Sequence, residues 1–284
     1  MSLEEIRNVM FDSYTVLAHY SDNELMRRVD SVLRQTFPSE KQLTWSELAP
    51  LDHFHVRGLL ATKELAAALH PVASTRFLDI GSGLGGPARF LAATSQCHVL
   101  GVDLTEPFVN VAKHLTERAG LTEKVEFLHG DALALPVADV AFDMAWMQHV
   151  AMNIVDRSRL YREAHRALKP GGKLAIYDLV TGNGRPLTYP LPWATSPAAS
   201  HLLTADATRE AILQTRFREN SWIDTTDASI VWFAEQQAAQ AAEPAAPKLN
   251  LQIIMGLEFG TMSANLAQHL RDGRLRTVQA VYQA

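Results

Sequence analysis

The feature that most constrains the fold of this chain is a glycine cluster between a short apolar segment and a helix. Residues 76–80 have the pattern of a buried strand, the cluster fills 81–86, and a proline at 87 suits the first turn of a helix predicted over 87–94. Glycine permits a tight turn and the close approach of a ligand, and the N–H groups at the helix start favour an anion. The spacing Gly81-x-Gly83-x-x-Gly86 therefore predicts a nucleotide-type site.

Strand and helix patterns alternate after this cluster. Such alternation predicts a parallel, doubly wound α/β sheet with the carboxyl ends of its strands at one edge, where ligands bind. Seven strands are predicted, together with helices between most of them. The strands cover 76–80, 97–102, 125–128, 141–146, 173–179, 221–226 and 275–282, and the helices cover 87–94, 107–119, 156–168, 206–218, 230–242 and 249–270.

The segments that flank this core differ from it in pattern. Helical periodicity predicts helices within 1–36 and over 52–69, with a loop that contains a short turn of helix over 41–50, and the prolines of 181–200 predict an ordered loop. A hinge-like linker is predicted over 241–247. We therefore divide the chain into a helical cap segment (1–72), a core (73–180), and a lid insertion that also completes the sheet (181–284).

Composition excludes several classes of function. Lys and Arg total 26 against 31 Asp and Glu, for a net charge of −5, which argues against a nucleic-acid binder. A single cysteine, Cys97, excludes a disulfide framework and a multi-thiolate zinc site, and we expect no metal. Neither a signal peptide nor an uncharged apolar run of about 18 residues is found. We expect a cytoplasmic protein without a membrane or nucleic-acid partner.

Acidic residues lie at or just after the ends of three of the predicted strands. Asp79 precedes the glycines, Asp103 ends the second strand where a carboxylate accepts from both ribose hydroxyls, and Asp131 follows the third strand. The turn at 168–172 leads into the fifth strand. In this order the elements resemble the class I S-adenosylmethionine-dependent methyltransferases. A nicotinamide dehydrogenase is the nearest alternative, but its pyrophosphate has no use for Asp79, and its fold requires neither Asp131 nor the turn.

The resemblance implies the fold, the cofactor and its binding residues. The sheet is expected to be seven-stranded, mostly parallel and Rossmann-like, with an antiparallel last strand, an N-terminal helical segment and a helical lid. S-adenosylmethionine is the implied cofactor and S-adenosylhomocysteine its product. The implied contacts cover the methionine part, the ribose and the adenine. The residues are Asp79, Gly81, Gly83, Asp103, Leu104, Asp131, Ala132 and the backbone around Gln148.

Further segments narrow the resemblance. Residues 51–58, 148–154 and 190–194 are similar to those of sarcosine/dimethylglycine-type small-molecule methyltransferases. That group methylates amines, hydroxyls and occasionally carbon. We therefore expect methyl transfer to nitrogen or oxygen of a small metabolite, within secondary metabolism or elsewhere. C-methylation of an apolar molecule and a catalytically silent cofactor-binding scaffold are the alternatives.

Two residues are candidates for catalysis. His149 follows the fourth strand, where an imidazole could act as a base, and Asp178 near the end of the fifth strand could orient it. Aromatic residues of the cap and lid could line the acceptor site. They are Tyr14, Tyr20, Tyr189 and Trp193. Whether the lid also forms a homodimer contact is left open.

Overall fold

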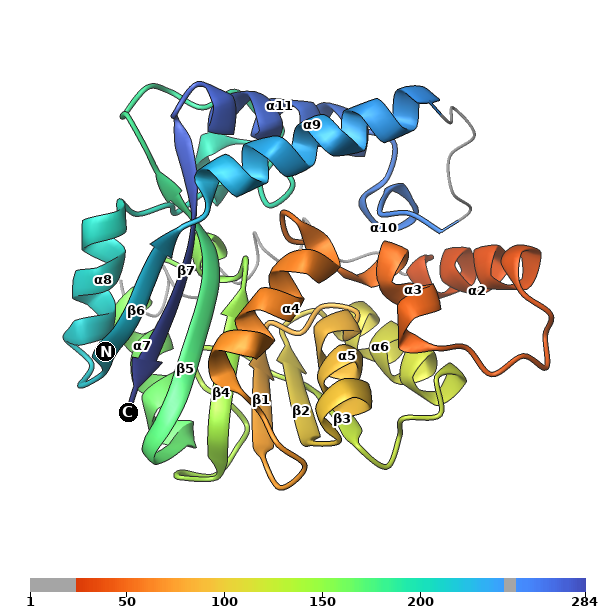
Figure 1. Ribbon diagram of the computed structural model, residues 1–284, viewed down its shortest axis with the longest axis horizontal. Coiled ribbons are helices and arrows are strands. Elements are labelled where there is room, and N and C mark those ends of the chain that lie inside the picture. The colour runs from red at the N-terminus through yellow and green to blue at the C-terminus, as the bar shows by residue number, and fades with distance from the viewer. Residues whose placement is uncertain (1–23, 243–248) are drawn as a thin grey trace.

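The computed structural model describes residues 24–242 and 249–284, so Tyr14, Tyr20 and most of the expected linker lie outside the described residues. Its centre is a seven-stranded sheet in the order β3-β2-β1-β4-β5-β7-β6 (Figure 1). The first five strands pair in parallel, and β7 runs antiparallel to both of its neighbours. The predicted doubly wound, mostly parallel sheet is confirmed.

The helices and strands have the following bounds. The strands are β1 (Arg76–Ile80), β2 (His98–Asp103), β3 (Val125–His129), β4 (Phe142–Gln148), β5 (Leu168–Thr181), β6 (Arg218–Asp224) and β7 (Leu275–Gln283). The helices are α2 (Leu25–Thr36), α3 (Trp45–Asp52), α4 (Gly58–Leu69), α5 (Gly86–Ser95), α6 (Glu106–Arg118), α7 (Arg157–Ala167), α8 (Ala205–Leu213), α9 (Thr226–Ala242), α10 (Gln252–Met255) and α11 (Phe259–Arg271).

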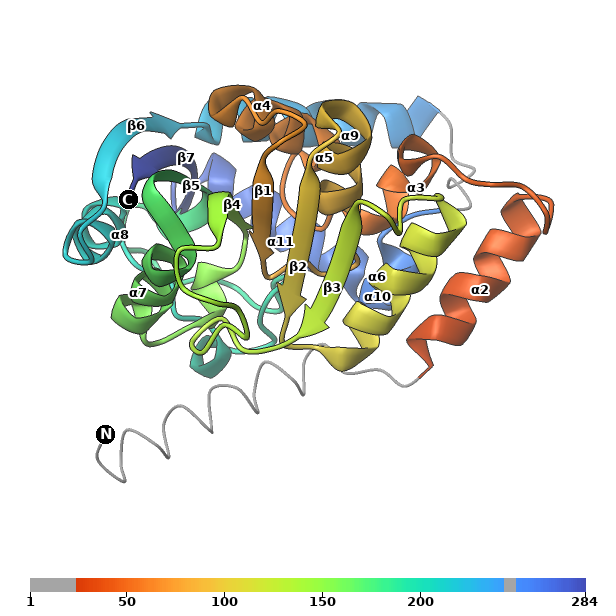
Figure 2. The same ribbon diagram turned by 90° about the horizontal axis from the view of Figure 1, so that it is seen from below.

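Both faces of the sheet are covered by helices, since successive strand residues point to opposite faces and both sets are apolar. Phe77 packs in a core shared with α4, α5 and α11, whereas Leu78 packs in a core shared with α7 and α8. A third core lies where α2 and α3 meet α6, and Figure 2 shows α2 beside α6. Figure 1 shows α9, α10 and α11 above the edge toward which the parallel strands run.

The segment before the glycine loop differs from the prediction. The short helical turn predicted within 41–50 is a longer helix, α3 over 45–52, which begins at a capping box. Thr44 and Glu47 form this box, since each side chain accepts from the other's backbone N–H, at 3.2 and 2.9 Å. The helix predicted over 52–69 begins only at Gly58. Residues 53–57 form a connection in which Arg57 has a φ of 63°. Pattern reasoning missed this break because it depends on the buried contacts of Asp52.

The last third of the chain also differs in detail. The single helix predicted over 249–270 is two helices, α10 and α11, because Gly256 has a φ of 78° and ends the first one. The helix predicted over 206–218 ends at Leu213, and Arg218 already begins β6. Within the described residues, no helix is long and apolar enough to cross a bilayer.

Candidate active site

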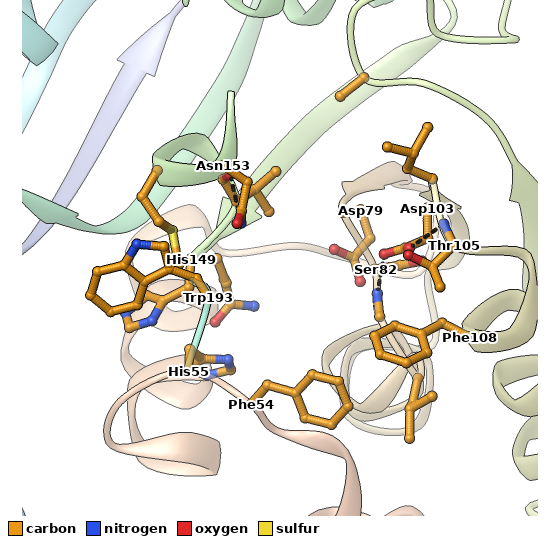
Figure 3. Close-up of a pocket in the computed structure, with 18 of the residues that line it drawn as sticks. Phe54, His55, Asp79, Ser82, Asp103, Thr105, Phe108, His149, Asn153 and Trp193 are labelled. Carbon is orange, nitrogen blue, oxygen red and sulfur yellow. Dashed lines mark hydrogen bonds between the residues drawn. The ribbon is translucent and has the colours of Figure 1, made fainter. Parts of the chain in front are cut away.

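One cavity lies at the carboxyl edge of β1, β2 and β4, under residues of the lid. Figure 3 shows two groups of labelled side chains around it, with Asp79, Asp103 and Thr105 on one side and His55, His149 and Trp193 on the other. The wall also includes apolar side chains from α6, α10, α11 and the turns between elements. They are Phe54, Leu84, Phe108, Met152, Met255, Phe259 and Leu266. The cavity thus joins the predicted cofactor residues to a second, largely apolar end.

The glycine turn forms the floor of the first end. Backbone N–H groups of Gly81 and Ser82 donate to the carbonyl of Val102 at 2.8 and 3.1 Å, which ties the turn to β2. Gly81 has a φ of 75°, and a Cβ there would lie 2.4 Å from Cγ2 of Val150. Only glycine satisfies both the conformation and the space at this position.

Asp103 connects the turn to the end of β2. Its Oδ2 accepts from the backbone N–H of Gly83 at 2.7 Å, and its Oδ1 accepts from that of Thr105 at 2.9 Å. Burial raises the pKa of Asp103, although both hydrogen bonds act in the opposite direction. Because a carboxylate has about four acceptor directions, both oxygens can still accept from a ligand hydroxyl.

Asp79 is a buried carboxyl group with an unused acceptor. Its Oδ2 has no hydrogen-bond partner among the described residues, although the side chain lines the cavity. Burial raises the pKa of Asp79 to about 7, and the nearby Asp103 acts in the same direction. A ligand ammonium group would supply both the missing hydrogen bond and the missing countercharge.

The outer part of this end is a narrow apolar space closed by a polar turn. Phe54 and Phe108 meet edge to face with their ring centroids 5.7 Å apart. Asp131 caps the turn after β3, where its Oδ1 accepts from the backbone N–H of Leu133 at 2.8 Å. Leu104 and Ala132 line the same space, so a flat ring with a polar edge would fit it.

At the second end, His149 follows directly after β4. It has a φ of 56°, and its backbone N–H donates to the carbonyl of Tyr177 at 2.8 Å. The centroid of the His149 imidazole lies 6.0 Å from that of the His55 ring. Nε2 of His149 has no hydrogen-bond partner among the described residues. Burial lowers the pKa of His149 to about 3, so the ring is neutral at neutral pH. Trp193 is buried beside it, and its Nε1 donates to Oγ of Ser200 at 3.0 Å.

Comparison with known proteins identifies the core. A family model described as a methyltransferase domain matches residues 78–176, which include the glycine turn, all three acids and His149. Residues 78–176 form a methyltransferase domain. This confirms the resemblance drawn from the sequence.

Two relatives illustrate how far the similarity extends. Methyltransferase GfsG of Streptomyces halstedii is 32% identical over 173 residues, which are 60% of this chain and 60% of that protein. A glycine/sarcosine/dimethylglycine N-methyltransferase of Actinopolyspora halophila is 40% identical over 104 residues, 37% of this chain and 18% of that protein. The chain therefore matches less than two thirds of either relative. Other matches are named for methylation of oxygen or of sterol carbon.

The fold is also found in solved structures. Geranyl diphosphate C-methyltransferase from Streptomyces coelicolor A3(2) superimposes with a TM-score of 0.68, covering 96% of this chain and 97% of that one at 15% identity. At this identity the likeness establishes the architecture, including the helices above the carboxyl edge of the sheet.

Most predicted site residues line the cavity of the methyltransferase domain. They are Asp79, Gly81, Gly83, Asp103, Leu104, Asp131, Ala132, Gln148, His149 and Trp193. Asp178 does not line it: its Oδ1 accepts from its neighbour's backbone N–H at 2.9 Å, and burial raises its pKa to about 6. Tyr189 packs half-buried against the core instead, and Tyr14 and Tyr20 lie outside the described residues. The structure therefore does not bring Asp178 together with His149 in the cavity.

Sequence reasoning missed the part of the site that precedes the glycine turn. Asp52 and His55 both line the cavity, and Asp52 makes an ion pair with the buried Arg89 of α5. A Cβ on Gly86 would lie 2.3 Å from Oδ1 of Asp52, so the last glycine of the motif is required by this contact. The run Asp-His-Phe-His at 52–55 is the signal that could have found these residues.

The methyltransferase domain fits S-adenosylmethionine in three respects. The unpartnered Oδ2 of Asp79 suits an amino group, the open acceptor directions of Asp103 suit ribose hydroxyls, and Gly81 leaves the space that a side chain would fill. No cluster of three or more metal-ligating side chains is found in 24–242 and 249–284.

Proposed function

We propose that this protein transfers a methyl group from S-adenosylmethionine to nitrogen or oxygen of a small-molecule metabolite. The observation that carries the proposal is the single cavity that connects Asp79 and Asp103 to the end formed by His149 and Trp193. Donor and acceptor must meet within one enclosed space, since methyl transfer is a direct displacement that depends on alignment. When bound, S-adenosylmethionine supplies an electrophilic methyl group on a sulfonium centre.

The residues of the first end would hold the donor. Asp79 would accept from its amino group, and Asp103 would accept from the ribose hydroxyls while it stays bonded to the glycine turn. Asp131 would accept from the adenine amino group, with Phe54 and Phe108 on the apolar side of the same space. These groups are preorganised, so binding would require little rearrangement.

At the acceptor end, His149 is our candidate base. Burial keeps His149 neutral, so its imidazole can accept a hydrogen bond from a hydroxyl or amine, and the same burial weakens it as a base. Trp193 and Met152 would exclude water from the reacting groups. An acceptor that binds as a neutral amine would need only to be positioned.

C-methylation of an apolar acceptor is the second candidate function. It is favoured by the apolar wall around Trp193 and by the fold shared with an enzyme named for C-methylation. A catalytically silent scaffold is the alternative from another class. Both N- or O-methylation and C-methylation require turnover, whereas a scaffold would bind the donor without consuming it.

Two measurements test the proposal. Calorimetry with the purified protein should show binding of S-adenosylmethionine and S-adenosylhomocysteine and none of NAD, and the bound ligands should raise the melting temperature. Incubation with methyl-tritiated donor and a small-molecule cell extract should release S-adenosylhomocysteine and label a product, whose mass exceeds that of its precursor by one CH₂ group. Tight NAD binding would overturn the proposal, and donor binding with no turnover in any extract would favour the scaffold.

A further inference from the structure

Two adjacent residues at the acceptor end each carry a polar atom that lacks a hydrogen-bond partner. Nε2 of Gln148 and Nε2 of His149 are buried, and neither has a partner within the described part of the chain. Both residues line the cavity, at the point where β4 ends. A buried polar group without a hydrogen-bond partner is destabilising. Two such groups on adjacent residues that line one cavity therefore indicate a place where a ligand completes the hydrogen bonding.

A chain of hydrogen bonds from the cap segment determines which end of the Gln148 amide is free. Nε2 of His55 lies 2.9 Å from the carbonyl of Gly58, and because a carbonyl only accepts, this nitrogen carries the proton. The same nitrogen lies 3.0 Å from Oγ1 of the buried Thr62, whose hydroxyl donates to Oε1 of Gln148 at 3.2 Å. The carbonyl of Gln148 is therefore occupied, and its NH₂ group remains as a donor.

The two imidazoles at this end of the cavity are neutral. Burial lowers the pKa of His55 well below its ordinary value, with His53 and His149 acting in the same direction, and burial also lowers the pKa of His149. Both imidazoles are therefore uncharged at neutral pH. Phe54, Met152 and Trp193 supply apolar walls.

We infer that Gln148 and His149 together bind an uncharged oxygen group, a hydroxyl or carbonyl, on the methyl acceptor. This rests on the proposed function and deepens it by naming the acceptor's chemical class. Gln148 donates to the oxygen, and a hydroxyl proton is accepted by His149. A carboxylate is disfavoured because the aspartates that line the same cavity repel it. An ammonium group is disfavoured because its N–H donors face the Gln148 donor. Thr62 is a positioning residue that acts through Gln148.

Three probes with one ring system test the inference: naphthol, naphthoate and naphthylmethylammonium. Each is titrated by calorimetry into the protein saturated with S-adenosylhomocysteine. We expect naphthol to bind at least about tenfold more tightly than the other two, because one or two buried hydrogen bonds separate them. Equal or tighter binding of either charged probe, or no binding of naphthol, would overturn the inference.

Matched variants test which residues cause the preference for naphthol. Gln148→Glu keeps an oxygen for Thr62 but replaces the donor by a negative oxygen, so the preference should shift from naphthol toward naphthylmethylammonium. Thr62→Val should weaken naphthol binding severalfold, and Thr62→Ser should restore it. Gln283→Glu makes the same change at the end of β7, away from the cavity, and should alter neither affinity. An unchanged preference in Gln148→Glu would contradict the assignment.

The binding of S-adenosylhomocysteine separates the two levels of the hypothesis. If it binds and the probes do not discriminate, only the inference about the acceptor fails. If it does not bind the unaltered protein, the proposed function fails and the inference fails with it.

Discussion

The carboxylate of Asp52 and the guanidinium of Arg89 meet at 2.6 Å, and both side chains are buried next to the glycine turn. The other Asp52 oxygen accepts from Nδ1 of His53 at 2.7 Å, and Arg89 also donates to the carbonyl of Leu84 at 2.6 Å. The end of α3 is thereby attached to α5 and to the turn. This attachment places Phe54 and His55 over the cavity.

Loss of this buried pair should destabilise the fold strongly. Arg89→Met leaves the Asp52 carboxylate buried without its cation, and we expect the free energy of unfolding to fall by about 3–5 kcal/mol. Urea denaturation measures this free energy of unfolding. The matched control is Arg209→Met, which breaks a partly exposed pair with Glu219 and should cost about 1 kcal/mol or less. Similar losses of unfolding free energy in the two variants would show that the buried pair stabilises the fold no more than the partly exposed one.

A side chain on Gly81 should disrupt the cofactor end. Gly81→Ala places a methyl group 2.4 Å from Val150 in a backbone conformation with a φ of 75°. Gly184 has the same φ with no atom within 4 Å of an added Cβ, so Gly184→Ala measures the conformational cost alone. That cost is about 1 kcal/mol. We expect Gly81→Ala to lower the melting temperature further and to weaken S-adenosylhomocysteine binding more than tenfold by calorimetry; equal behaviour of the two variants would contradict the steric argument.

Removal of the Asp103 carboxylate should weaken cofactor binding. Asp103→Ala deletes the acceptor for Gly83 and the acceptor expected for the ribose hydroxyls, so the binding free energy of S-adenosylhomocysteine should fall by about 1–3 kcal/mol. Calorimetry gives the dissociation constant. Asp224→Ala, at the exposed end of β6, is the control and should bind normally. An unaltered dissociation constant in Asp103→Ala would remove the ribose assignment.

The buried carboxyl of Asp79 should make stability depend on pH. Its pKa is raised to about 7, so between its ordinary value of 3.8 and 7 the folded protein holds a proton that the unfolded chain has released. Folding is therefore favoured at low pH by this group, and that contribution is lost as pH rises toward 7. Relative to Asp79→Asn, which cannot titrate, the unaltered protein should lose stability from about pH 4 to pH 7 and then level off. Urea denaturation at several pH values tests this, and a constant difference would show that Asp79 is ionised throughout.

His149→Ala should separate chemistry from cofactor binding. The imidazole lies at the acceptor end with its Nε2 unpartnered, so its loss should lower turnover more than it lowers affinity for S-adenosylmethionine. General-base contributions are typically 10²–10⁴-fold, and we expect a loss within about that range if the acceptor must lose a proton. Tritium transfer into the labelled product measures turnover. Unchanged turnover would leave His149 with a binding role only.

Local patterns predicted the core of the fold and its first binding end. The order of strands and helices from β1 to β5, the glycine turn, and the position of Asp103 all depend on residues close together in sequence. Their conformations follow from alternation, helix periodicity and the freedom of glycine, which act over short distances. For this reason the predicted sheet and ten site residues are where the patterns indicated.

Tertiary structure decided how the acceptor end is assembled. His55, Thr62 and Gln148 form one hydrogen-bond chain although up to 93 positions separate them, and Asp52 meets Arg89 across 37 positions. Likewise, Asp178 lies near the carboxyl end of β5, beside the strand that His149 follows, but it does not line the cavity. Such relationships depend on which buried faces pack together, and no spacing rule within one element encodes that packing. The sequence by itself therefore determined the fold and the residues that we propose for the cofactor, whereas three-dimensional packing determined how the second end of the cavity is built.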